Sequence, residues 1–224
     1  MAVRAMQLPG GYRYLFLSLL ALLVVYPVLS NVERAAPWID VIVYLVMVAG
    51  ILAPRSSHRQ RIIATVLGIL AFIFLRLADG VSAEWVLVTS YILGTAFFGY
   101  LAIHILRDIL LERRKVTGEM VYGALAVYLI IGVAFAFAYQ LFDHINADAF
   151  ENTGLLAGNT IQAFEGFLYF SFVTMTTLGF GDITPHTPQA GAFVTAQAII
   201  GQMYLAVLVA RLVSLQITHQ LEER

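Results

Sequence analysis

Cysteine is absent from the 224 residues of the chain. A disulfide framework and a thiolate metal site are therefore both excluded. The apolar segments also lack a cluster of His and Glu residues at metal-ligand spacing, a nucleophile elbow and a phosphate-binding loop. From these absences we predict that the protein is not an enzyme and needs no cofactor.

Charged residues are scarce as well. Asp, Glu, Lys and Arg make up 12% of the residues, hydrophobic residues make up 60%, and the mean hydropathy is +0.83. A typical soluble domain has about 25% charged residues, so we predict a polytopic membrane protein surrounded by lipid. The net charge of −1 gives no reason to expect nucleic acid as a partner. Only a short tail follows the last apolar run, so we expect no cytoplasmic ligand-sensing domain.

Long apolar runs, by contrast, are abundant. Crossing a bilayer as a helix takes about 20 apolar residues, and six segments qualify: 12–30, 38–53, 62–78, 85–106, 120–142 and 190–212. A seventh segment, 161–176, is long enough only for a re-entrant helix, and 107–116 has the pattern of a short helix at the membrane surface. The predicted fold class is an all-α membrane protein with six transmembrane helices and one re-entrant helix.

The basic residues predict the orientation of this array. Apart from Arg34 and Arg76, every Lys and Arg lies near the start of the first segment, between the second and third, between the fourth and fifth, or at the end of the last. Cytoplasmic loops carry the excess of Lys and Arg. We therefore predict that both termini are cytoplasmic and that the protein lies in the cell membrane.

The segment from 174 to 182 reads Thr-Met-Thr-Thr-Leu-Gly-Phe-Gly-Asp. A backbone that turns successive carbonyl groups toward one axis needs positive φ at alternate residues, and Gly179 and Gly181 adopt positive φ without the cost of a Cβ atom. Leu178 and Phe180 would then point away from the axis and pack, while Thr177 could add its hydroxyl oxygen at the inner end. Oxygen ligands of this kind suit an alkali cation that has lost its water.

This segment, set between a short re-entrant helix and a long apolar one, resembles the selectivity filter of tetrameric potassium channels. The resemblance implies a four-fold homotetramer, because one chain supplies only one of the strands that surround the ion. It also implies K⁺ as the permeant ion, bound by oxygens of Thr177, Leu178, Gly179 and Phe180, with Gly181 completing the filter. Residues 116–224 would form the pore module, made of an outer helix, a pore helix, the filter and an inner helix.

Five residues near the filter are implied to support it. Tyr169 and Phe170 stand where pore helices of the family usually carry tryptophan, and they would form an aromatic cuff around the filter. Asp182 can form a hydrogen bond to this cuff, with Tyr169 as the candidate partner. Thr176 stands at the negative end of the pore helix, and Val173 replaces the Glu that some relatives place behind the filter.

Phe180 also departs from the family pattern, because many relatives have tyrosine there. The substitution keeps the ring and loses the hydroxyl group. Since Val173 removes a second polar group, we expect a filter that is held more by packing than by a polar network. Potassium selectivity remains the prediction, because non-selective relatives tend to lose this aromatic residue altogether.

The last apolar segment contains a glycine and two glutamines of interest. Gly201 resembles the hinge glycine of the family's inner helix, and close helix packing is an equally weighted alternative. Gln197 and Gln202 are polar within a segment that crosses lipid. We therefore expect them to face an aqueous cavity or a neighbouring helix.

Residues 1–115 form a predicted four-helix module that resembles a voltage sensor. A voltage sensor needs several Arg or Lys residues at every third position of its fourth helix, and 85–106 has none. We therefore expect weak or no voltage dependence. Asp40 and Arg76 would lie at similar depth and could form an intramembrane pair. The role of His104 and the gating stimulus stay open.

The sequence thus predicts a channel that conducts K⁺ passively. A non-selective monovalent cation channel of the same fold is one alternative. A potassium transporter subunit is a second, although such subunits carry four degenerate filter repeats in one chain and this chain has a single one. The third alternative is an enzyme or a structural membrane protein in which Gly-Phe-Gly is incidental.

Overall fold

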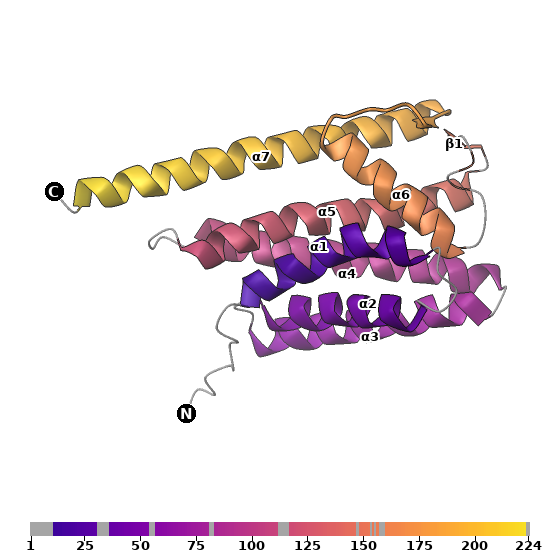
Figure 1. Ribbon diagram of the computed structural model, residues 1–224, viewed down its shortest axis with the longest axis horizontal. Coiled ribbons are helices and arrows are strands. Elements are labelled where there is room, and N and C mark those ends of the chain that lie inside the picture. Colours follow the sequence, from indigo (N-terminus) through magenta and orange to yellow (C-terminus); the bar gives the residue numbers. More distant parts are fainter. Residues whose placement is uncertain are drawn as a thin grey trace. The chain divides into compact units, whose positions relative to one another are not determined.

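The computed structural model describes residues 11–30, 36–53, 57–80, 83–111, 117–146, 148–152, 154, 156 and 160–222 (Figure 1). The helices of this part are α1 (Gly11–Ser30), α2 (Ala36–Leu52), α3 (His58–Gly80), α4 (Glu84–Leu111), α5 (Gly118–Ile145), α6 (Thr160–Met175) and α7 (Pro188–Glu222). Two short strands, β1 (Phe150–Asn152) and β2 (Ile183–Pro185), flank α6 in the sequence. The described structure is mainly helical, as predicted.

Four described helices contain apolar stretches long enough to cross a membrane: His58–Ala78, Glu84–Leu111, Gly118–Ile145 and Pro188–Ser214. The described apolar parts of α1 and α2 are shorter, at Gly11–Val25 and Val41–Leu52, so the count of six spans stays a prediction. α6 has 16 residues, fewer than the roughly 20 that a span requires. The chain therefore has the helices of a membrane protein and one short apolar helix between α5 and α7 in sequence.

The end of α4 differs from the sequence prediction. A separate surface helix over 107–116 was expected, but α4 continues as one helix to Leu111, and 112–116 lies outside the described residues. The reason is that the buried row of α4 continues past residue 106. Leu101, Ile105 and Ile109 are all buried, and residues four apart lie on the same face of a helix.

The described residues group into two compact units. Unit 1 consists of residues within 1–66, 100–130 and 206–224, and unit 2 of residues within 67–99 and 131–205. These units cut across the predicted modules 1–115 and 116–224, and the functional division into those modules stays a prediction.

In unit 1, Tyr12 at the start of α1 connects three helices. Its backbone N–H donates to Oε2 of Glu119 on α5 at 3.1 Å, and its hydroxyl donates to Oδ2 of Asp108 on α4 at 3.0 Å. The ring lies against Gly123, where an added Cβ atom would be 3.1 Å from Tyr12 Cγ. Arg211 of α7 donates from Nη2 to the backbone oxygen of Leu110 at 3.1 Å. Within unit 1 these bonds connect the starts of α1 and α5, the end of α4 and α7 at Arg211.

Unit 2 has an aromatic core. Tyr139 of α5 is fully buried, and its ring lies 5.2 to 6.2 Å, centroid to centroid, from the rings of Phe150, Phe167, Phe170 and Phe193. These residues come from β1, α6 and α7. The core therefore packs the three elements around α5.

The strands of unit 2 were not predicted from the sequence. β1 pairs antiparallel with β2, with Phe150 opposite Pro185 and Asn152 opposite Ile183. The backbone N–H of His186 continues the pairing by donating to the oxygen of Ala149 at 2.9 Å. The strand pair thus joins the loop after α5 to the residues that follow 177–182.

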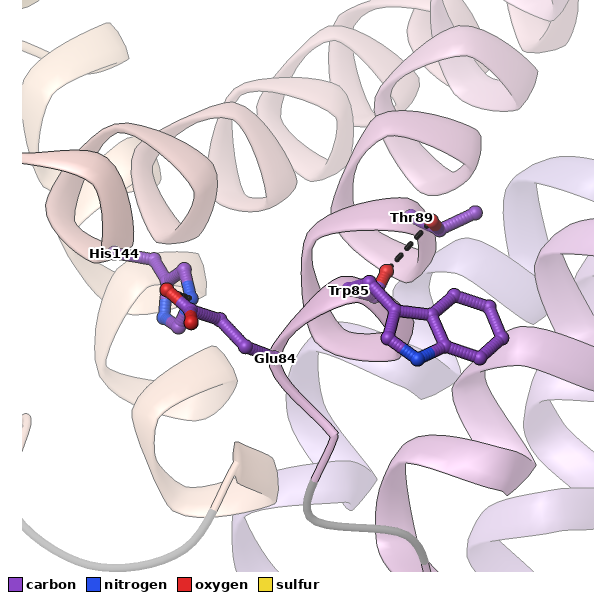
Figure 2. Close-up of polar contacts among 4 residues, drawn as sticks. All are labelled: Glu84, Trp85, Thr89 and His144. Atoms are coloured by element: carbon purple, nitrogen blue, oxygen red, sulfur yellow. Dashed lines mark hydrogen bonds and ion pairs between the residues drawn. The ribbon is translucent and has the colours of Figure 1, made fainter.

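The start of α4 meets the end of α5 through an exposed ion pair in unit 2 (Figure 2). Nε2 of His144 lies 3.8 Å from Oε1 of Glu84. The Glu84 side chain is 85% exposed, so the pair contributes at most about 1 kcal/mol. Within α4, the Thr89 hydroxyl donates to the backbone oxygen of Trp85 at 2.6 Å. Trp85 is itself exposed.

Candidate functional site

The backbone of 177–182 has a regular alternation of positive φ. Thr177 has φ 60°, Gly179 has φ 57° and Gly181 has φ 79°. Alternate left-handed residues are the backbone pattern expected of a segment whose successive carbonyl groups turn to one side, and glycine supplies two of them at little cost. The sequence predicted this conformation for Gly179 and Gly181 and did not predict it for Thr177.

Thr177 adopts its conformation because it terminates α6. Its backbone N–H donates to the oxygen of Thr174 at 3.1 Å, and the N–H of Leu178 donates to the oxygen of Val173 at 3.0 Å. This is the paired arrangement of a Schellman motif, whose left-handed position is usually glycine. A β-branched residue with positive φ is strained, and such strain concentrates at functional sites.

The threonine hydroxyl groups at this end make local bonds. The Thr176 hydroxyl donates to the backbone oxygen of Phe172 at 2.6 Å, and the Thr177 hydroxyl donates to the oxygen of Thr176 at 2.6 Å. Each hydroxyl gives its only proton to a carbonyl group and keeps its lone pairs as an acceptor. The oxygen of Thr177 can therefore still face a cation.

The C-terminal end of the segment is held by Asp182. The Tyr169 hydroxyl donates to Oδ2 of Asp182 at 2.5 Å, and the N–H of Ile183 donates to Oδ1 at 3.0 Å. The Tyr169 ring also stacks on the ring of Phe180, with centroids 6.4 Å apart and planes at 10°. The structure thus contains the Tyr169–Asp182 hydrogen bond that the sequence suggested, and the carboxylate joins α6 to the start of β2.

Phe170 and Val173 lie on the buried side of α6. Phe170 packs against Tyr139 and Phe150, with ring centroids 5.2 and 5.6 Å apart, and Val173 is buried. The two residues predicted to form the cuff therefore have different contacts in this chain. Tyr169 contacts Phe180, whereas Phe170 belongs to the aromatic core.

A buried polar network holds α6 against α5 and α7. The Tyr139 hydroxyl donates to Oε1 of Gln197, and Nε2 of Gln197 donates to Oγ of Ser171 at 2.6 Å and to its backbone oxygen at 3.3 Å. The Ser171 hydroxyl then donates to the backbone oxygen of Gly132 at 2.7 Å. The expectation from the sequence, a filter held more by packing than by a polar network, concerned 177–182 and stays a prediction; the network described here lies between α6 and its neighbouring helices and was not predicted.

The described elements from α5 to α7 form a connected arrangement of long helix, short helix, left-handed segment and long helix. Residues 123–216 match the family model described as ion channel. The matched range includes most of α5, all of α6 and the segment 177–182. Among curated proteins, no match to the chain was found. The match supports an ion channel family and passive ion conduction by this part of a membrane protein.

Within the matched range, Gln202 and Gly201 of α7 both contact the end of α6. Nε2 of Gln202 donates to the backbone oxygen of Met175 at 2.9 Å. A Cβ atom at Gly201 would lie 3.3 Å from Met175 O and Cγ, and α7 continues through Gly201 without a break (Figure 1). This close approach supports the packing alternative for Gly201, while its role as a gating hinge stays a prediction.

Gly201→Ala separates the two roles. The added methyl group would press on the backbone of Met175, so overpacking should cost about 1–3 kcal/mol and move the carbonyl group that Gln202 binds. We expect a changed ion selectivity, measured as a shift of the reversal potential under asymmetric salt. A hinge without a packing role would instead change the open probability and leave the reversal potential as in the wild type.

The predicted pair of Asp40 and Arg76 lies partly outside the described residues. The guanidinium carbon of Arg76 is 5.8 Å from the ring centroid of Phe72. Asp40 belongs to α2, but its side chain is not among those described, so the pair stays a prediction. Within the described residues, no group of three or more His, Asp or Glu side chains could hold a metal ion.

Proposed function

We propose that the chain forms a potassium-selective channel in which K⁺ passes down its gradient between four identical subunits. The observation that carries the proposal is the alternation of positive φ at Thr177, Gly179 and Gly181, within the range that matches the ion channel family. This backbone can present a row of carbonyl oxygens, which replace the water of a potassium ion. The ion ligands would be oxygens of Thr177, Leu178, Gly179 and Phe180.

The proposed homotetramer is supported by the large apolar side chains that are exposed in a single chain. Leu178 and Phe180 are 59% and 65% exposed, although both are apolar and lie beside the proposed ion path. A neighbouring subunit would cover them. α7 also exposes a series of large apolar side chains: Ile199, Ile200, Met203, Val207, Val209 and Val213. Such a surface requires lipid or another copy of the chain.

The orientation and the gating follow from charge. We propose six spans with both termini in the cytoplasm, which places 177–182 near the outer face. Residues 85–106 of α4 contain no Arg or Lys, so the first four helices would form a sensor-like module with weak or no voltage dependence. No described residue identifies the stimulus that would open the channel.

Recording from purified protein in a planar bilayer tests the proposal. With K⁺ on one side and Na⁺ on the other, we expect unitary currents whose reversal potential follows the potassium equilibrium potential. The open probability of the channel should change little during a voltage ramp. A reversal potential that ignores the potassium gradient would indicate a non-selective cation channel. Saturable potassium flux without unitary current steps would indicate a transporter subunit.

A further inference from the structure

We propose that Gln197 and Gln202 are positioning residues whose side-chain amides hold α6, and with it the inner end of 177–182, at a fixed place on α7. This role rests on the proposed potassium-channel function. It concerns side chains that bond to α6 and do not touch the ion.

Gln197 provides the first link. Its side chain is fully buried. Its Nε2 atom donates to both the hydroxyl and the backbone oxygen of Ser171, and its Oε1 atom accepts from Tyr139. A buried amide that is bonded at both ends cannot move without leaving a polar atom unpaired, which is costly. The middle of α6 is therefore fixed to α7 and, through Tyr139, to α5.

Gln202 provides the second link at the end of α6. The carbonyl group of Met175 belongs to the last residue of the helix, where no later residue of the helix can donate to it. Nε2 of Gln202 donates to this oxygen at 2.9 Å. Met175 lies two residues before Thr177, whose positive φ begins the left-handed alternation. The bond thus fixes the helix end from which the proposed filter starts.

The two links act together because they reach separate points on α6. Ser171 and Met175 are four residues apart and so lie on one face of the helix. Gly201, beside Gln202, allows the backbones to approach closely at the second point. One link would leave α6 free to pivot, whereas two links fix its tilt as well as its position. A displacement of α7 is therefore passed to the inner end of 177–182.

The test uses the full-length channel in planar bilayers with K⁺ and Na⁺ on opposite sides. Gln202→Met keeps the length of the side chain and removes the donor, and Gln202 is exposed, so the variant should fold and assemble. We expect the permeability of Na⁺ relative to K⁺ to rise by about fivefold, the factor that one neutral hydrogen bond supports. The midpoint of thermal unfolding should fall by no more than a few degrees. Gln189→Met, at an exposed position in the first turn of α7, should change neither quantity.

A second variant tests the buried link. Gln197→Met alone would leave the hydroxyl of Tyr139 without an acceptor, so it is combined with Tyr139→Phe. The double variant should also raise the relative permeability of Na⁺. Wild-type protein without potassium current would overturn the proposed function and this role with it. A potassium-selective wild type whose permeability ratio is unchanged in both Gln202→Met and the double variant would overturn the positioning role alone.

Discussion

Gly179→Ala should abolish the potassium-selective current while the chain still folds. Gly179 has φ 57°, in the left-handed region where a Cβ atom costs about 1–2 kcal/mol per residue. Four subunits would carry this cost together, about 4–8 kcal/mol for the assembled filter. We expect the backbone to relax by turning a carbonyl group away from the axis, which removes an ion ligand. Bilayer recordings should show roughly a thousandfold or greater loss of potassium current, since each 1.4 kcal/mol is a factor of ten.

Gly191→Ala is the matched control for this substitution. Gly191 lies in α7, and an added Cβ atom there would meet no atom within 4 Å. The same holds for Gly179 in the single chain, so the two sites differ in backbone conformation and not in local space. Gly191→Ala should keep the wild-type current and gain up to about 1 kcal/mol of helix stability. Wild-type potassium current in Gly179→Ala would remove the assignment of 177–182 as a filter.

Much of the fold could be predicted because it depends on local sequence. The short helix expected at 161–176 is α6 at Thr160–Met175, since a run of this length and polarity can form a helix but not a span. Positive φ at Gly179 and Gly181 follows from a glycine at alternate positions. Neither result requires knowledge of a distant contact. The number of spans and the assembly of four chains remain proposals, because they depend on the membrane and on other subunits.

The polar network around α6 could not be predicted, because its partners are far apart in the chain. Tyr139 and Gln197 are separated by 58 residues, and Ser171 and Gln197 by 26. The sequence showed that Gln197 is polar within an apolar segment. This indicated that its side chain meets water or a neighbouring helix, but it did not identify the partner residue. Tyr139 and Ser171 gave no signal of their own. The pairing of β1 with β2 was missed for the same reason.

The segment 177–182 is anchored at both ends and exposed in its middle. Its N-terminal end is fixed by the helix termination at Thr177 and by the bond from Gln202 to Met175. Its C-terminal end is fixed by Asp182, which accepts hydrogen bonds from Tyr169 and Ile183. Between these anchors Leu178 and Phe180 are exposed, with the ring of Phe180 stacked on Tyr169. In the proposed homotetramer the backbone would thus be set before assembly, and contacts between subunits would complete it.

Gly132→Ala should destabilise the packing of α6 on α5 by about 1–3 kcal/mol, the usual cost of overpacking. An added Cβ atom at Gly132 would lie 2.5 Å from Cζ of Phe172 and 2.7 Å from its Cε1, so the ring must move. The carbonyl group of Gly132 also accepts the hydroxyl proton of Ser171, so a shift of the helix would disturb the bonds of Gln197. Thermal unfolding of the purified protein should show a lower midpoint. Gly99→Ala, where the Cβ atom meets nothing within 4 Å, should not lower it.

Combining Gly132→Ala with Phe172→Leu identifies the cause of that loss. Each single change should lower stability, the first by overpacking and the second by removing ring atoms that pack beside Gly132. If the contact with the ring is responsible, the smaller leucine side chain makes room for the added methyl group. The free energy of unfolding lost in the double variant should then be smaller than the sum of the two single losses by about 0.5–3 kcal/mol, as expected for residues in contact. Strictly additive losses would show that Gly132 acts through the backbone of α5 and not through its approach to Phe172.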